Sequence, residues 1–193
     1  MNDFLIWFKL GTEHLMEPGA MDHFLFLAIL AVSYPPTEWK KILWLILAFT
    51  IGHGLSMLLG TTFDLPLPEK WIEIGIALTI LLSAIIHFPR TQYKALALPF
   101  AFGSVLVFGL IHGLGFSMQL RSLLGNGDSL MQPLIYFNLG LEAAQNTIVI
   151  SVIGFSLLLT AVTKVPGSVF KFIIICFSGL TALFMTAERL LQL

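Results

Sequence analysis

Ionisable and amide side chains recur inside apolar stretches of this sequence, where such groups are rarest. We expect the metal ligands to be His14, Asp22, His23, His53, His112 and Glu142, supported by Glu73, Asn138 and Gln145. A buried charge in hydrocarbon costs about 2.5–3.5 kcal/mol on insertion scales, so several together must be offset by pairing, a metal or a water-filled cavity. Imidazole and carboxylate together suit divalent transition metals. The inventory therefore predicts a site for a divalent transition metal such as Ni²⁺, Zn²⁺, Co²⁺ or Cu²⁺.

The spacing of these residues favours one shared pocket. Asn138, Glu142 and Gln145 are separated by four and three positions, so they face one way on a helix. His53 lies between two glycines, and a third glycine directly follows His112. Small residues let helices approach closely and bring polar atoms of different helices within reach of one another.

Each of these residues also has a plainer interpretation. Asp22 suits the N-cap of a helix, a role that is compatible with metal ligation. His14 could lie among lipid headgroups, and the midspan histidines could bond backbone carbonyls. Ionisable groups deep in a span favour function, and Glu142 is the clearest case. His87 is expected to lie at the opposite interface.

Composition places these residues in a membrane protein. Of 193 residues, 57% are hydrophobic and 11% are charged, against about 25% charged in a typical soluble domain. A chain of this size cannot bury so much apolar surface in water, so lipid must be its solvent. The net charge of −1 gives no basic surface for nucleic acid, and a single cysteine, Cys176, excludes an intrachain disulfide.

Apolar runs of roughly bilayer length predict an all-α polytopic membrane bundle of about six transmembrane helices. We expect these spans at residues 21–34, 39–59, 71–88, 96–120, 133–162 and 169–191. Prolines and glycine-rich loops separate them. Residues 1–20, which are interrupted by charges, are predicted to form an interfacial or re-entrant segment, and residues 1–193 to form a single transmembrane domain.

The placement of lysine and arginine sets the expected orientation. The first, third and fifth loops carry six of these residues and the opposite face carries four. This bias places those loops in the cytoplasm and both termini outside, and we expect an integral protein of the bacterial inner (cytoplasmic) membrane. On this topology the predicted ligands fall in the outer half of the bundle, and the inner half is almost purely apolar.

Four segments that carry these residues together resemble a known family. They read HLMEPGAMDHFLF (residues 14–26), AFTIGHGLS (48–56), FGLIHGLGFS (108–117) and FNLGLEAAQ (137–145). In this order they are similar to the motifs of the HupE/UreJ family of small membrane proteins. The resemblance implies that the functional positions are Asp22, His23, His53, His112 and Glu142.

The family is generally described as nickel permeases or accessory proteins of hydrogenase and urease, so the resemblance implies membrane transport of a divalent metal, nickel above all. The residues themselves leave an alternative open, an intramembrane zinc hydrolase acting on a lipid, lipoprotein or peptide. Three histidines and a carboxylate could hold Zn²⁺ with an open position. Glu142 or Asp22 would then act as general base. A metal-stabilised accessory subunit without turnover is a third interpretation.

Overall fold

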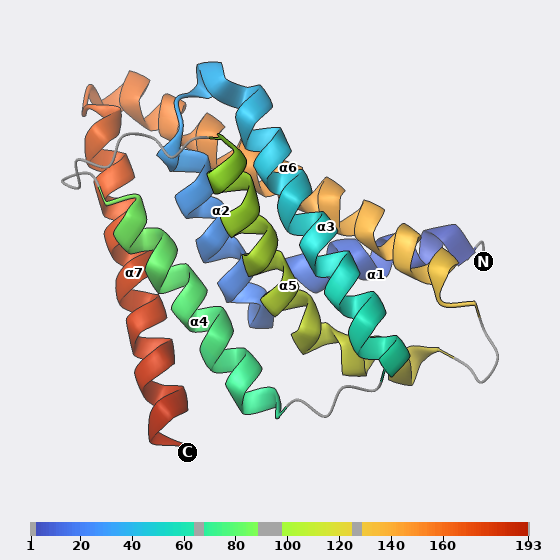
Figure 1. Ribbon diagram of the computed structural model, residues 1–193. Helices are drawn as coiled ribbons and strands as arrows, with labels where there is room; N and C mark the ends of the chain where they lie inside the picture. The colour runs from blue at the N-terminus through green and yellow to red at the C-terminus, as the bar shows by residue number, and fades with distance from the viewer. Residues whose placement is uncertain (1–2, 64–67, 89–97, 125–128, 193) are drawn as a thin grey trace.

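The computed structural model describes residues 3–63, 68–88, 98–124 and 129–192, and every regular element within them is helical. The α-helices (Figure 1) are α1 (Asp3–Met16), α2 (Met21–Ser33), α3 (Trp39–Phe63), α4 (Glu69–Ile86), α5 (Leu98–Leu123), α6 (Met131–Thr163) and α7 (Gly167–Leu191). Two short 3-10 turns, η1 (Pro18–Ala20) and η2 (Pro36–Glu38), precede α2 and α3. The prediction of an all-α polytopic bundle is confirmed. Helices α2 to α7 coincide with the six predicted spans, but only four or five of these segments have the length and hydropathy of a membrane span.

Prolines and one left-handed residue set several helix ends. Tyr34 is extended (φ −116°, ψ 146°), because the ring of Pro35 excludes the α region for the residue before it. α6 ends at Thr163 and is capped by Lys164, which adopts a φ of 62° and donates its N–H to the carbonyl of Thr160. Pro166 then precedes the first turn of α7. Such signals are local, so the predicted boundaries lie within a few residues of the observed ones.

Four helices, α3, α5, α6 and α7, are each long and apolar enough to cross a membrane. α1 and α2 meet the same criterion as a pair, but the chain bends by 78° between them, as in a broken span or a re-entrant loop. α4 has 18 residues and carries Glu69, Lys70 and Glu73 near its start. These charges are costly in lipid, so this end of α4 belongs at an interface or beside polar groups. The interfacial placement of residues 1–20 stays a prediction.

Glycines allow two pairs of helices to pack backbone against backbone. α3 and α5 approach so closely that a Cβ on Gly113 would collide with the carbonyl of His53. α1 lies along α6 in the same way, since a Cβ on Gly140 would collide with the carbonyl of Phe8. Lipid tails are as apolar as these helices, so close van der Waals packing holds such pairs together. The close approach predicted from the glycines around the midspan histidines is present.

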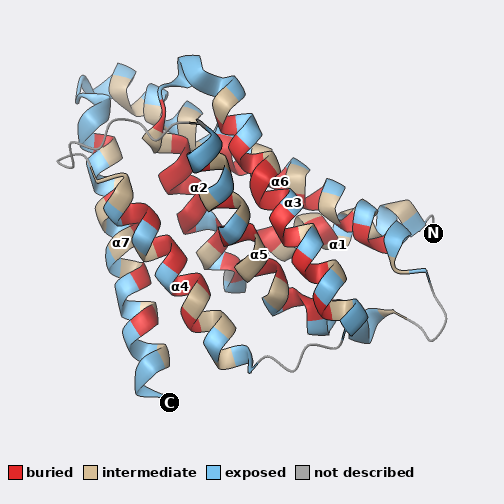
Figure 2. Cartoon of the chain, viewed as in Figure 1, coloured by how far each residue is buried: buried red, intermediate tan, exposed pale blue. Residues whose placement is uncertain are grey.

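α2 is the buried helix at the centre of the bundle. All of its residues from 25 to 31 are buried, and it packs against α4, α6 and α7. Figure 2 shows this burial in red along α2, whereas α6 and α7 leave much of their surface exposed, as lipid-facing helices do. The first turn of α2, which carries Asp22 and His23, is therefore held in place by several neighbours at once.

Candidate metal centre

Four helices bring four histidines together. His14 lies in the last turn of α1 and His23 in the first turn of α2, and the η1 turn between them places their ring centroids 5.3 Å apart. The His53 ring of α3 lies 6.0 Å from both. The His112 ring of α5 lies 4.9 Å from that of His23. Residues from the first and fifth helices thus meet at one point.

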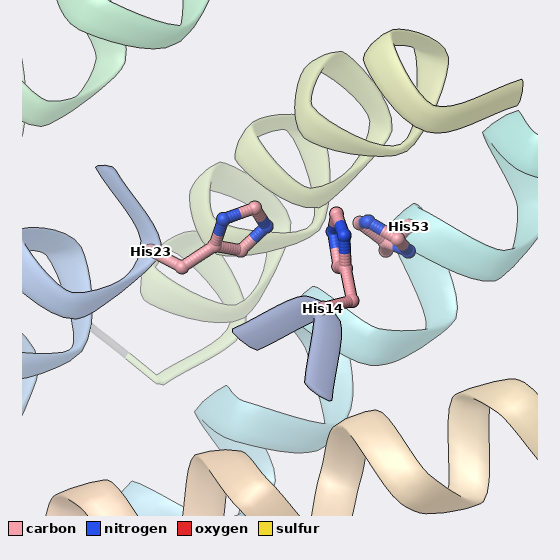
Figure 3. Close-up of side chains that lie close together, drawn as sticks. All are labelled: His14, His23 and His53. Carbon is pink, nitrogen blue, oxygen red and sulfur yellow. The ribbon is translucent and has the colours of Figure 1, made fainter. Parts of the chain in front are cut away.

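Two sets of three ligand atoms in this cluster could each hold a metal ion. Ligand atoms of His14, His23 and His53 lie within 4.8 Å of one another, and so do those of Asp22, His23 and His112. Figure 3 shows the first set, in which the three rings gather between their helices. Ligands of a tetrahedral ion with bonds of about 2.0–2.1 Å lie roughly 3.3 Å apart. Small side-chain rotations would therefore close either set around an ion.

Hydrogen bonds give two of the histidines the tautomer of a metal ligand. His23 donates its Nδ1–H to Asp22 Oδ1 at 2.9 Å, and its buried Nε2 has no partner among the described residues. Thr79 donates its hydroxyl to the Ile76 carbonyl at 2.7 Å, so His112 Nε2, 3.4 Å from the Thr79 oxygen, is the donor in that contact. The unpartnered Nδ1 of His112 then carries the lone pair. Metal-ligating histidines are commonly oriented in this way by a bond to the other ring nitrogen.

The cluster is buried, and its unpaired nitrogens are costly. The exposed fraction is 0% for His53, 2% for His112 and 5% for His23. Both ring nitrogens of His53 and the Nε2 of His14 also lack a hydrogen-bond partner within the described part of the chain. A buried polar group without a partner costs about 1–3 kcal/mol. Several such groups at one point favour a site whose ligand supplies the missing partner.

Phenylalanine rings wall the cluster. The ring-centroid distances are 4.3 Å for Phe116–His14, 5.2 Å for Phe49–His112 and 6.4 Å for Phe137–His53. These rings lower the local dielectric constant, which strengthens the attraction between a bound cation and a nearby carboxylate. Sequence reasoning missed them. Their signal was spacing, since Phe49 precedes His53 and Phe116 follows His112 by four residues, on the same helix face.

A cavity of about 240 Å³ connects the cluster with the protein surface. Its lining includes His14, Asp22, His23 and His112 together with Glu17, Glu69, Glu73 and Arg189. Glu17 and Glu69 are exposed, so this wall reaches the surroundings. His53 is absent from the lining and lies deeper. A cation could therefore reach the cluster past carboxylates, without crossing the apolar core.

The predicted ligand Glu142 belongs to a second polar group. The hydroxyl of Thr50 lies within hydrogen-bonding reach of Glu142 Oε2, and 2.8 Å from Oε1 of Gln145. Thr50 precedes His53 by three residues on α3, so this group adjoins the cluster. Glu142 is in neither ligand set among the described residues, and its ligation stays a prediction. Sequence reasoning also missed Thr50, although a hydroxyl one turn from a midspan histidine was a usable signal.

The other two supporting residues have partners within the protein. Asn138 donates its Nδ2 to the Leu134 carbonyl at 2.8 Å, and its side chain lies against Gly54. Glu73 forms an ion pair with Arg189, in which Oε2 and Nε are 3.6 Å apart. Asn138 thus lies beside the cluster, and Glu73 lies at the wall of the cavity.

Comparison with known proteins adds one match. A family model described as HupE / UreJ protein matches residues 1–189. No curated protein and no solved structure matches the chain. The family match includes every residue of the cluster, and the resemblance inferred from the four sequence segments is confirmed.

Proposed function

This chain belongs to the HupE/UreJ family, and we propose that it transports a divalent transition metal, nickel above all, through the histidine and carboxylate cluster. The observation that carries the proposal is the convergence of four imidazoles, each with a buried ring nitrogen that lacks a partner among the described residues. Imidazole and carboxylate are suitable ligands for Ni²⁺. The metal is the cargo, so these ligands have to bind it and then release it.

Two ligand sets that share one residue are suited to a metal ion that is bound first by one set and then passed to the other. Asp22, His23 and His112 line the cavity, so an arriving ion would meet this set first. It would then exchange ligands for those of His14 and His53, while His23 stays bound. The ion would never lose all its ligands at once, and binding at several sites of moderate affinity permits both capture and release.

The polar group around Thr50 supplies the next step inward. On the expected topology, with both termini outside, Thr50 lies closer to the cytoplasmic face than His53 does, and Glu142 lies closer to it than Asn138. A cation leaving His53 would therefore meet the oxygens of Thr50, Glu142 and Gln145. The cavity would open outward, so the direction would be uptake across the bacterial inner membrane.

Flux into liposomes tests this proposal. Ni²⁺ added outside should reach a metal-sensitive dye inside vesicles with the wild-type protein, and should not with His112→Ala. His87→Ala is the matched control, because His87 lies in neither ligand set and donates its Nδ1–H to the Ser83 carbonyl at 2.9 Å. Wild-type vesicles that admit no Ni²⁺, although the protein retains metal, would contradict transport.

The size of the cavity favours a second candidate function, a metal-dependent hydrolase. A volume of about 240 Å³ leaves room beside an ion for several waters or a small organic group. His14, His23 and His53 could hold zinc, which when bound would supply Lewis acidity and an acidified water. Asp22, on the cavity wall, could act as general base towards a lipid, lipoprotein or peptide. Metal-dependent hydrolysis in the absence of flux would favour this candidate.

A further inference from the structure

The cavity has a mouth, which we define as Glu17, Glu69, Glu73 and Arg189, so that three carboxylates and one guanidinium line the same opening. Glu69 and Glu73 lie one turn apart on α4 and share a face. Excess carboxylate at the opening of a low-dielectric cleft concentrates cations there. The imidazole of His112, only 2% exposed and with an unpartnered Nδ1, lies on the wall of the same cavity. The mouth and the cluster therefore form one route for a cation.

Arg189 is the exception in this acidic mouth, and it is held by Glu73 alone among the described residues. Its Nη1 donates to the backbone carbonyl of Glu73, and its Nε lies 3.6 Å from the carboxylate Oε2. The second distance is that of an ion pair longer than a hydrogen bond. The side chains are 21% exposed for Arg189 and 44% exposed for Glu73. The backbone bond thus anchors the guanidinium, while the charge contact is looser.

We propose that the Glu73 carboxylate, beside Glu69 and Glu17, is the first binding site for an incoming divalent cation, and that Arg189 occupies this site until the cation arrives. The inference rests on the proposed function and specifies how the cargo is admitted. A divalent ion brings twice the charge of a guanidinium and can bind carboxylate oxygens directly, so it displaces Arg189 from Oε2. The bond to the backbone carbonyl keeps α7 against α4 during this exchange. A monovalent cation has no such advantage in charge.

A purely structural role makes a different prediction. Arg189 lies in the last turn of α7, where the helix dipole favours a cation, and it could serve only to tie α7 to α4. Arg189→Gln retains a donor for the carbonyl but has no charge, whereas Arg189→Lys retains the charge. If Arg189 only holds α7 against α4, both variants would have a lower thermal stability and neither would bind metal more tightly. If Arg189 instead competes with the metal ion for the Glu73 carboxylate, Arg189→Gln would bind the metal more tightly, and Arg189→Lys would restore wild-type affinity.

Ni²⁺ titration of the purified full-length protein, followed by Ni²⁺ uptake in liposomes, measures the effect. Arg189→Gln should bind Ni²⁺ about threefold more tightly, the size expected for a partly exposed ion pair, and K⁺ should compete better than in the wild type. Glu73→Gln should weaken binding, and the double variant should match Glu73→Gln alone. Lys70→Gln is the matched control. Like Arg189→Gln it removes one positive charge, but Lys70 lies on α4 outside the cavity lining, so Ni²⁺ binding should stay unchanged.

Two results would overturn the inference. One is an Arg189→Gln protein that binds Ni²⁺ no more tightly than the wild type. The other is tighter binding that persists in the Glu73→Gln background, because Arg189 would then act on the imidazoles directly and not through Glu73. The titration needs no transport, so an absence of wild-type uptake would refute the proposed function alone, and the role of Arg189 would still be decided by Ni²⁺ binding.

Discussion

His23 belongs to both ligand sets, so its removal should reduce metal affinity the most. His23→Ala leaves His14 with His53 in one set, and Asp22 with His112 in the other. Zinc peptides bind their metal through four ligands with about 10–16 kcal/mol, which is about 3 kcal/mol per ligand. Since about 1.4 kcal/mol corresponds to a factor of ten, His23→Ala should bind Ni²⁺ about a hundredfold more weakly than the wild type.

Isothermal titration of purified protein with Ni²⁺ measures this loss. His23→Asn should lose affinity to a similar extent, because the amide offers Asp22 a donor in place of Nδ1 but supplies no counterpart of the unpartnered Nε2. This second variant separates loss of the lone pair from loss of ring packing. His87→Ala should bind as the wild type does. A loss smaller than about tenfold in both His23 variants, or an equal loss in His87→Ala, would refute the assignment of His23 as the shared ligand.

Three further changes test the surroundings of the cluster. Gly140→Ala should push α1 away from α6, because the added Cβ meets the Phe8 carbonyl, and should therefore weaken Ni²⁺ binding in the same titration. Gly19→Ala is the control, because its Cβ would meet nothing within 4 Å, and it should bind Ni²⁺ as the wild type does. Thr50→Val keeps the side-chain volume but removes the hydroxyl that Glu142 contacts, so Ni²⁺ flux into liposomes should fall while equilibrium binding stays unchanged. Stepwise acidification from about pH 7 should release Ni²⁺ in equilibrium dialysis, because protons compete for the imidazole lone pairs, and stronger binding at lower pH would contradict ligation by histidine.

The helices could be predicted closely because their signals are local. A run of apolar residues predicts a span wherever it occurs in the chain, and prolines such as Pro35 and Pro166 end or begin helices through their own ring geometry. The packing of α3 on α5 was also foreseeable in part, since a glycine beside His112 signals a close approach. The interfacial or re-entrant segment predicted for residues 1–20 implies a bend before α2, but the angle of 78° was not predictable, because it depends on how α1 lies along α6.

The candidate site was predictable as a set of residues but not as an arrangement. His14, Asp22, His23, His53 and His112 all fall in the two ligand sets. Glu142 had the strongest case from the sequence, yet its carboxylate lies with Thr50. The depth of a residue within a membrane span follows from its position in the chain. The direction of a side chain depends on the rotation of its helix, which packing against other helices decides.

The amino-acid sequence by itself determined that this chain is a helical membrane protein with imidazoles and carboxylates at one level, because hydrophobicity and proline act residue by residue. Only the tertiary structure decided which of these groups meet. It divided the polar residues between the histidine cluster and the Thr50 group, placed phenylalanines around the rings, and brought Arg189 to Glu73 at the cavity mouth. The physical reason is that such contacts join distant parts of the chain, and their geometry follows from helix crossing and rotation.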